Sequence, residues 1–186
     1  ILVTLILFSC IYCILMINKT QVYAKETATS WLPSVEAFAK INNTFGSLSR
    51  HGVLVIANNI ANQLEESEKN KADILKFRNE IEKILKDYIT NGMIAPGEQP
   101  YYDATLKSYN DFMKAVDEEL TMARSGKALE ALTHYKAVGR KLALEFQANA
   151  EKEAKFNADG AEGSTKQGES LTSITNWTMA AVIICS

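Results

Sequence analysis

The first seventeen residues constrain the fold of this chain more than any other stretch, because none of them is charged. Residues 1–17 are predominantly apolar, and Asn18 and Lys19 end the run. A helix that spans a bilayer needs roughly 20 apolar residues, with about 17 as the lower limit. The chain also opens on Ile rather than Met, so we expect further residues before it. Residues 1–17 therefore predict most of a first transmembrane helix, truncated at its N-terminus.

The C-terminal end has the same character. Residues 174–186 carry no charge and finish Met-Ala-Ala-Val-Ile-Ile-Cys-Ser. They include Trp177, and tryptophan is enriched where a span enters the membrane interface. We interpret this stretch as the truncated start of a second transmembrane helix. Residues 18–173 then form one extramembrane domain anchored at both ends.

A secretory signal peptide is the alternative interpretation of the N-terminus. The stretch Val22-Tyr23-Ala24 resembles a small-residue cleavage site. The apolar run is longer than the usual hydrophobic region of about 7–15 residues in a signal peptide. A signal peptide also leaves the apolar C-terminus unexplained, whereas two membrane spans explain both ends. We therefore favour the membrane anchor.

Charge and cysteine placement separate the middle of the chain from its ends. All 20 basic and 22 acidic residues fall between Lys19 and Glu169, with a net charge of −2. This balance argues against a nucleic-acid partner, which needs a clustered basic surplus. The cysteines Cys10, Cys13 and Cys185 all lie in the apolar ends, so the domain has no disulfide. We interpret Cys10 and Cys13 as lipid-facing packing residues rather than a metal or redox site.

Hydrophobic residues recur every three or four positions in four successive segments between the apolar ends. This spacing predicts amphipathic helices, each with one buried face, and no strand-like alternation persists anywhere. A polar break at residues 65–70, a Pro- and Gly-containing loop at 91–100 and Ser125-Gly126 separate the segments. The predicted helices cover residues 31–64, 71–89, 101–123 and 127 onward. Four helices with short turns predict an all-α fold, an up-down-up-down antiparallel four-helix bundle.

Three glycines interrupt the polar tract that follows the fourth apolar stripe. Gly160, Gly163 and Gly168 each cost roughly 1 kcal/mol relative to alanine in a helix. The tract therefore predicts a poorly packed lower helix that leads into the second span, or alternatively a deliberately soft joint.

Several local motifs resemble a known family. They are Trp-Leu-Pro-Ser-Val at residues 31–35, Arg50-His51, Tyr109 with Phe112, and Arg-Ser-Gly-Lys-Ala-Leu-Glu-Ala at residues 124–131. With the two apolar ends, the chain resembles the extracytoplasmic four-helix-bundle sensor domain of bacterial methyl-accepting chemotaxis proteins. The same bundle is similar to the sensor modules of membrane histidine kinases and diguanylate cyclases.

This resemblance implies a function and a setting. It implies a homodimeric periplasmic sensor in the bacterial inner membrane that binds a small organic acid or amino acid. It also implies cytoplasmic signalling partners, reached through a C-terminal part that follows Ser186. A membrane-tethered helical structural protein without a small ligand is the alternative from another functional class.

Arginine offers a planar fork that pairs with carboxylates through two hydrogen bonds, so arginines are the first candidates for ligand contact. Helix rise is about 1.5 Å per residue, which places Arg50, Arg140 and Tyr109 at one level, roughly 20–24 Å below the distal turns. The same calculation places Arg78 and His134 roughly 10–12 Å down, as a second tier. These five residues are the predicted ligand contacts. The alternative is that the arginines are surface residues paired with Glu or Asp.

The sequence predicts no enzyme, no cofactor and no metal site. His51 and His134 differ in predicted height by roughly 12 Å, too far apart to be the two axial ligands of one haem iron. Glu130 and His134 are four residues apart, but a di-iron bundle needs a repeated Glu-x-x-His motif with further inward carboxylates. No nucleophile–base pair and no phosphate-binding loop stands out.

Overall fold

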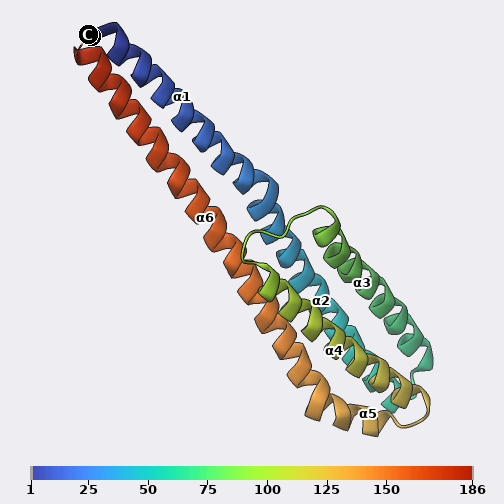
Figure 1. The fold of residues 1–186 in the computed structure, drawn as a ribbon. Helices are drawn as coiled ribbons and strands as arrows, with labels where there is room; N and C mark the ends of the chain where they lie inside the picture. The colour runs from blue at the N-terminus through green and yellow to red at the C-terminus, as the bar shows by residue number, and fades with distance from the viewer. Residues whose placement is uncertain (1, 186) are drawn as a thin grey trace. The chain divides into compact units, whose positions relative to one another are not determined.

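The chain is built from helices joined by short turns (Figure 1). The computed structural model describes residues 2–185, so Ile1 and Ser186, at the ends of the two apolar runs, lie outside the described residues. The described residues contain no strand, which confirms the predicted all-α class. The elements are α1 (Leu2–Glu26), a π-helical segment (Thr27–Trp31), α2 (Leu32–Ile60), α3 (Leu64–Thr90), α4 (Gln99–Arg124), α5 (Ala128–His134), a second π-helical segment (Tyr135–Gly139) and α6 (Arg140–Cys185).

The turn between α2 and α3 lies earlier than the sequence predicts. We predicted a polar break at residues 65–70, but α2 ends at Ile60 and α3 begins at Leu64. Asn62 adopts a positive φ of 57°, a conformation that asparagine tolerates better than most residues. Glu65 and Glu66 stand in the first turn of α3, where the helix dipole favours negative charge. The predicted break was therefore wrong, because these charged residues begin a helix instead of interrupting one.

The other two turns lie where the sequence predicts them. The loop before α4 contains Gly92 and Gly97 at φ values of 64° and 86°, and Gly126 before α5 has a φ of 80°. Glycine occupies this left-handed region without the steric cost that a side chain adds. Both turns therefore depend on glycine at these positions.

Contacts within the chain group its residues into two compact units. We call Ser34–Phe156 the bundle unit, and Ile1–Pro33 together with Asn157–Ser186 the terminal unit. Helices α2 and α6 contribute residues to both units. The predicted domain limits at residues 17 and 173 remain a prediction, and each unit is described by itself below.

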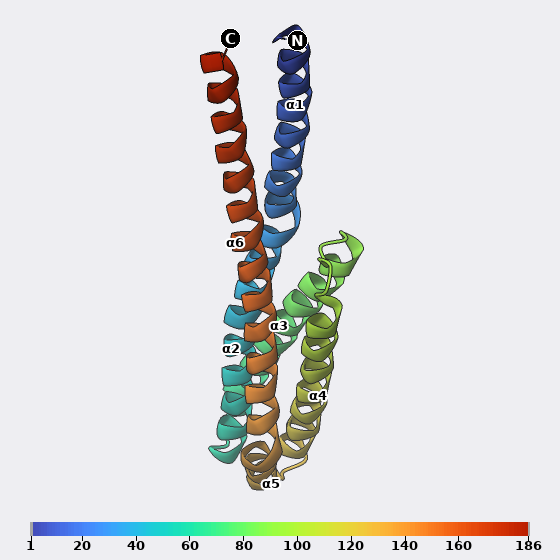
Figure 2. The same ribbon diagram turned by 60° about the vertical axis from the view of Figure 1, so that its left-hand side comes forward.

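The bundle unit packs large aromatic side chains between its helices. In this unit α2, α3, α4 and the first part of α6 lie side by side in alternating directions (Figures 1 and 2), which confirms the predicted four-helix bundle. The rings of Phe45 on α2 and Phe146 on α6 have centroids 4.3 Å apart, and Phe112 on α4 lies 4.8 Å from Phe45. Tyr88 and Tyr102 stack at 5.7 Å. The stripes predicted from the sequence therefore meet in one aromatic core.

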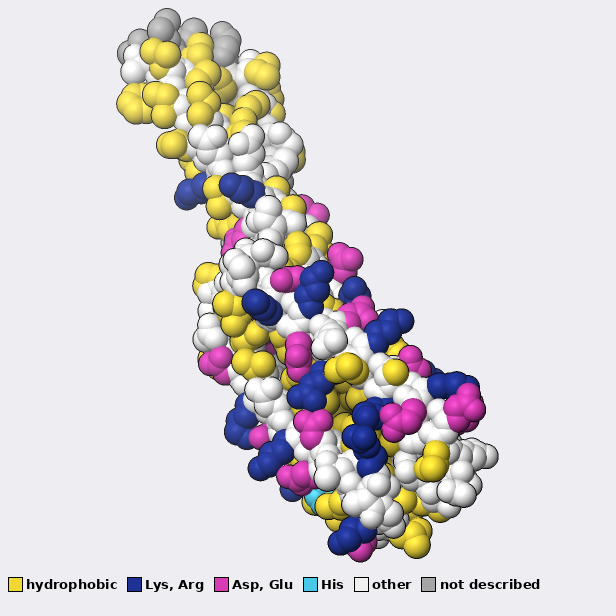
Figure 3. Space-filling model, turned by 90° about the vertical axis from the view of Figure 1, so that its right-hand side faces the viewer, with side chains coloured by type: hydrophobic (Ala, Val, Ile, Leu, Met, Phe, Trp, Pro, Cys, Tyr) yellow, Lys and Arg dark blue, Asp and Glu magenta, His cyan; other side chains and the backbone are white. Residues whose placement is uncertain are grey.

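The terminal unit has the opposite pattern of exposure. Large apolar side chains of α1 and α6 point outward, among them Leu7, Phe8, Ile11, Ile183 and Ile184. Figure 3 shows hydrophobic side chains gathered over the ends of these two helices, with no charged side chain among them on that face. The buried residues that the structure describes here are mostly small or polar: Cys13, Asn157, Ala161, Ser164 and Thr175, together with Trp31.

Two sequence predictions in this unit need correction. Cys10 is exposed, but Cys13 is buried, so only the first can face lipid. Gly160 lies directly against the Trp31 ring, at a distance that leaves no room for a Cβ. This part of α6 is therefore closely packed at Gly160, whereas Gly163 has open space beside it.

One helical stretch in the described residues, Ile6–Ile60, contains a window long and apolar enough to cross a membrane, judged by length and composition alone. A signal sequence meets the same criterion, so both interpretations of the N-terminus stay open. The second predicted span, at residues 174–186, stays a prediction.

Candidate functional site

A groove between α3 and α4 in the bundle unit contains one of the predicted ligand residues, Arg78. Its volume is about 540 Å³. Both charge signs line it, beside an amide and two methionines. The lining residues are Arg78, Asn110, Met113, Lys114, Asp117, Glu118, Thr121 and Met122.

The Arg78 guanidinium is already engaged by two carboxylates. Its Nε donates to Glu82 Oε1 at 2.9 Å, and its Nη1 donates to both oxygens of Asp117 at 3.0 and 3.1 Å. Burial acts to lower the pKa of Arg78, but the hydrogen bonds and charges of Glu82 and Asp117 outweigh it and raise the pKa. Arg78 therefore links α3 to α4, and a carboxylate ligand would have to compete with Asp117 for it.

Tyr109 lies at the level of Arg78 but faces the core. Its hydroxyl lies 3.5 Å from the backbone carbonyl of Arg78, and its ring packs 5.7 Å from that of Phe146. Burial, more than the charge of Glu82, raises the pKa of Tyr109, so the hydroxyl stays neutral. Tyr109 is a buried packing residue next to the groove rather than part of its lining.

The two predicted tiers are not observed as predicted. Arg78 lies 14 residues after Leu64, the start of α3, which corresponds to roughly 21 Å of helix. Tyr109 lies 15 residues before Arg124, the end of α4, or roughly 22 Å. Because α3 begins earlier than predicted, Arg78 lies at the level of Tyr109 and not in the upper tier.

Arg50 and Arg140 do not join this groove. Both side chains are exposed, and neither forms an ion pair with any residue that the structure describes. The predicted clamp of two arginines with a tyrosine is therefore not assembled around the groove. Whether these two arginines contact a ligand stays a prediction.

His134 lies between two carboxylates of α4. Its Nδ1 is 3.1 Å from Glu119 Oε1, and its Nε2 is 3.6 Å from Glu118 Oε2. Burial raises the pKa of Glu119, and the hydrogen bond with His134 partly offsets the rise. Gly139, in the second π-helical segment, lies so close to Glu119 that a Cβ there would meet its carboxylate. Glu118 also lines the groove of Arg78, so it lies near two of the predicted ligand contacts, Arg78 and His134.

The sequence did not single out the acidic partners on α4. Asp117, Glu118 and Glu119 form one run, which reads as an exposed polar turn of the helix. Glu119 is nevertheless buried, while Asp117 and Glu118 are exposed. The available signal was its position between Val116 and Leu120 of the predicted stripe, close to the buried face.

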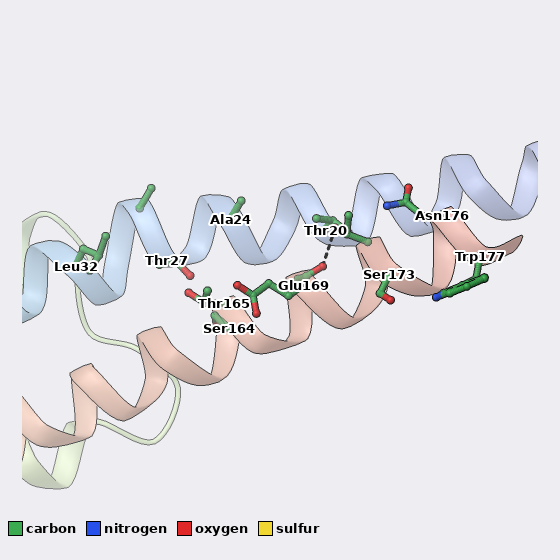
Figure 4. A pocket seen from close by; sticks show the side chains of 13 residues that line it. Thr20, Ala24, Thr27, Leu32, Ser164, Thr165, Glu169, Ser173, Asn176 and Trp177 are labelled. Atoms are coloured by element: carbon green, nitrogen blue, oxygen red, sulfur yellow. Dashed lines mark hydrogen bonds between the residues drawn. The ribbon is translucent and has the colours of Figure 1, made fainter. Parts of the chain in front are cut away.

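A second groove lies within the terminal unit, between α1 and α6 (Figure 4). Its volume is about 730 Å³, and small and hydroxyl-bearing residues dominate its walls. Among the lining residues that the structure describes, Glu169 alone is charged, so this groove offers no cation to a carboxylate ligand. The described residues contain no cluster of three His, Cys, Asp or Glu side chains that could hold a metal ion.

Comparison with known proteins identifies the family. A search of curated proteins and a search of solved structures returned no significant match. Residues 1–172 match the family model described as a four helix bundle sensory module for signal transduction. The match covers the predicted first span and nearly the whole bundle. The chain therefore belongs to the family of four-helix-bundle sensory modules of methyl-accepting chemotaxis proteins.

Proposed function

We propose that the chain is the periplasmic sensor region of a bacterial chemoreceptor in the inner membrane. Membership of the sensory family supports this function. The outward apolar side chains of the terminal unit support a membrane setting. Side chains such as Phe8 and Ile184 are exposed in the chain itself, and contact with lipid would shield them from water. The receptor acts as a homodimer and reaches cytoplasmic signalling partners through a part that follows this chain.

The ligand is a small organic acid or amino acid, and the observation that carries this is the groove of Arg78. The groove offers the guanidinium of Arg78, the ammonium of Lys114 and the amide of Asn110. A ligand carboxylate can take the two guanidinium hydrogen bonds that Asp117 now accepts. An amino group of the ligand would find Asp117 and Glu118 on the same wall.

Ligand binding at this place is coupled to helix packing. The ion pair from Arg78 to Asp117 joins α3 to α4, so a ligand that replaces Asp117 removes one connection between these helices. A shift of about 1–2 Å at packed helices is a common switching amplitude. Helix α6 has residues in both units and is the element that carries such a shift inward. The ligand must bind the two packings with different affinity for this to signal.

Thermal unfolding of the whole chain in detergent micelles tests the ligand class. A panel of organic acids and amino acids is screened for compounds that raise the midpoint temperature. A ligand at 100 times its Kd stabilises by about 2.7 kcal/mol, which corresponds to a rise of roughly 5–10 °C for a chain of this size. Arg78→Ala is expected to abolish the rise. Arg124→Ala is the matched control, because this exposed arginine lies outside the groove.

The variants Arg50→Ala and Arg140→Ala locate the site further. If they abolish the rise and Arg78→Ala does not, the ligand binds at these exposed arginines and the assignment to the groove is wrong. If no compound of the panel raises the midpoint, the chain has no ligand of this class.

A disulfide tests the signalling step in a receptor that carries its cytoplasmic part. Cysteines are placed at facing positions of α2 and α6 near the contact of Phe45 with Phe146. Freezing the offset of these helices should abolish the ligand response, and reduction should restore it. A full response in the oxidised receptor would exclude this mechanism.

A further inference from the structure

The imidazole ring of His134 places each of its two nitrogens next to a carboxylate of α4. Its Nδ1 lies 3.1 Å from Glu119 Oε1, and its Nε2 lies 3.6 Å from Glu118 Oε2. A neutral imidazole has one N–H, so its other nitrogen would present a lone pair to a carboxylate that can only accept. The imidazolium has an N–H on both nitrogens. The geometry therefore suits a ring that carries the extra proton.

Glu119 is the buried member of this group. Its relative exposure is 4%, and a buried carboxylate is costly unless it is paired or hydrogen-bonded. Among the residues that the structure describes, His134 supplies the hydrogen bond to this carboxylate. A Cβ at Gly139 would collide with the same carboxylate, so the glycine leaves the space that Glu119 fills. The contact is therefore built into the packing of α4 against the second π-helical segment.

Glu119 and His134 bind a proton as a pair, because they are in contact. Burial raises the pKa of Glu119, the hydrogen bond and charge of His134 act against the rise, and the charge of Glu118 adds to it. Whether the proton lies on the ring or on the carboxyl, it stays between the same two groups. The pair thus retains a proton that a carboxyl in water would release.

The charges near His134 on its own part of the chain do not replace this proton. Glu130 lies one turn earlier on α5, lines a groove together with His134 and pairs with Lys127 at 3.4 Å. In the second π-helical segment, Lys136 is exposed and Tyr135 packs against an apolar cluster. The charge that shares a groove with the ring is therefore negative.

The neighbouring helices bring no further base to the ring. Ile56 of α2 lies in one apolar cluster with residues of α5, and residues 52–60 of α2 contain no titratable side chain. Arg78 reaches the groove of Glu118 from α3, but its guanidinium is paired with Glu82 and Asp117. The acidic groups of α4 are therefore the ones that act on the ring.

The position of the pair connects it to α6. His134 is the last residue of α5, and Gly139 ends the second π-helical segment, after which α6 begins at Arg140. Both ends of this segment thus meet the carboxylate of Glu119 on α4. The pair holds the stretch of chain through which α5 continues into α6.

We propose that Glu119 and His134 form a proton-operated clasp, in which one bound proton holds α5 and the second π-helical segment on α4 and its loss releases them. With the proton, the ring and the two carboxylates Glu118 and Glu119 together carry one negative charge; without it, they carry two. The proton is then a second input to the sensor, applied at the start of α6. The clasp needs no organic ligand, so it can be tested apart from the ligand groove.

The pH dependence follows from the raised pKa of Glu119. In the unfolded chain this carboxyl titrates near the ordinary value of 4.5, so the folded pair holds a proton that the unfolded chain releases. The stabilisation is fully present below about pH 4.5 and is lost as the pH rises through the range in which the folded pair gives up its proton.

Hydrogen exchange in residues 128–139 tests the clasp in the whole chain, in micelles and without organic ligand. After correction for the intrinsic pH dependence of exchange, we expect wild-type protection to fall by about fivefold to tenfold between pH 5 and 9, as a charged hydrogen bond becomes a neutral one. His134→Gln keeps a donor but binds no proton, so its protection should stay level. His51→Gln is the matched control, because this histidine contacts Asn70 and Asp73 on α3, and it should follow the wild type. Level protection in the wild type, or the same fall in His134→Gln, would overturn the proposal.

Thermal unfolding over the same pH range separates the two carboxylates. The wild-type midpoint should fall as the pH rises, and that of Glu119→Gln should fall by roughly 2–4 °C less, because the buried charge is gone. Glu118→Gln removes an exposed and more distant charge and should keep most of the wild-type fall. A full wild-type fall in Glu119→Gln, or its loss in Glu118→Gln alone, would contradict a clasp formed by the buried pair.

Discussion

The two units bury opposite kinds of side chains. The bundle unit buries Phe, Tyr and Ile between its helices and exposes charged residues. The terminal unit exposes Leu, Ile, Phe and Trp, with Trp177 at 75% and Ile184 at 84%, and buries mostly small or polar residues. A helix pair in water is stabilised by burying large apolar groups, whereas helices in lipid associate through small residues that permit close approach. This contrast is what our proposal of a bundle in water and a terminal unit in lipid predicts.

The largest expected effect lies in the aromatic core of the bundle unit. Phe146 is fully buried and touches both Phe45 and Tyr109. Phe146→Ala should reduce the free energy of unfolding by about 3–5 kcal/mol, because a large cavity replaces the ring. Chemical denaturation in micelles measures this loss. Leu144→Ala, on the exposed side of the same helix, should change stability by less than about 0.5 kcal/mol. Equal losses in both variants would show that the bundle unit lacks this packed core.

The next effect concerns the exposed apolar side chains of the terminal unit. A lysine at the centre of a membrane span costs about 2.5–3.5 kcal/mol of insertion free energy. Phe8→Lys should therefore reduce the fraction of chain that resists alkaline extraction from membranes. Phe8→Leu keeps an apolar side chain and should leave this fraction unchanged. Full retention of Phe8→Lys in the membrane would break the comparison, because α1 would then not face lipid.

A smaller effect tests close packing inside the terminal unit. A Cβ at Gly160 would collide with the Trp31 ring, so Gly160→Ala should destabilise the chain by about 1–3 kcal/mol. Gly163→Ala is the matched control, because a Cβ there has open space. Alanine in an unstrained helix position should stabilise by about 0.5–1 kcal/mol. Opposite signs for the two variants in thermal unfolding would confirm the packing, and two stabilising substitutions would contradict it.

The bundle could be predicted from the sequence because its helices carry a regular apolar stripe. The stripe depends only on side-chain size and spacing, and the glycines before α4 and α5 marked their turns correctly. The turn before α3 was misplaced, since Glu65 and Glu66 look like a polar loop but suit the first turn of a helix. Nothing in the pattern of apolar residues predicted the two π-helical segments.

The levels of the candidate site residues were harder to predict, because each level is counted from the residue at which its helix begins or ends. A start of α3 seven residues earlier than expected moves Arg78 by roughly 10 Å along the bundle. The apolar stripe did mark Tyr109 as a residue of the core face. The buried state of Glu98 could not be foreseen, because it follows Pro96-Gly97 in a polar loop. Its carboxylate accepts a hydrogen bond from the hydroxyl of Tyr88 on α3.

Thiol labelling in intact cells tests the central claim most directly. One variant keeps Cys10 as its single cysteine; another carries Ser125→Cys, in the exposed turn before α5, with the three native cysteines replaced by serine. A membrane-impermeant maleimide that crosses only the outer membrane is added before and after lysis. Our account predicts that Ser125→Cys reacts before lysis and that Cys10 does not, because lipid shields its thiol from a reagent dissolved in water. Labelling of Ser125→Cys only after lysis, or rapid labelling of Cys10 in intact cells, would contradict a periplasmic bundle with a membrane-embedded terminal unit.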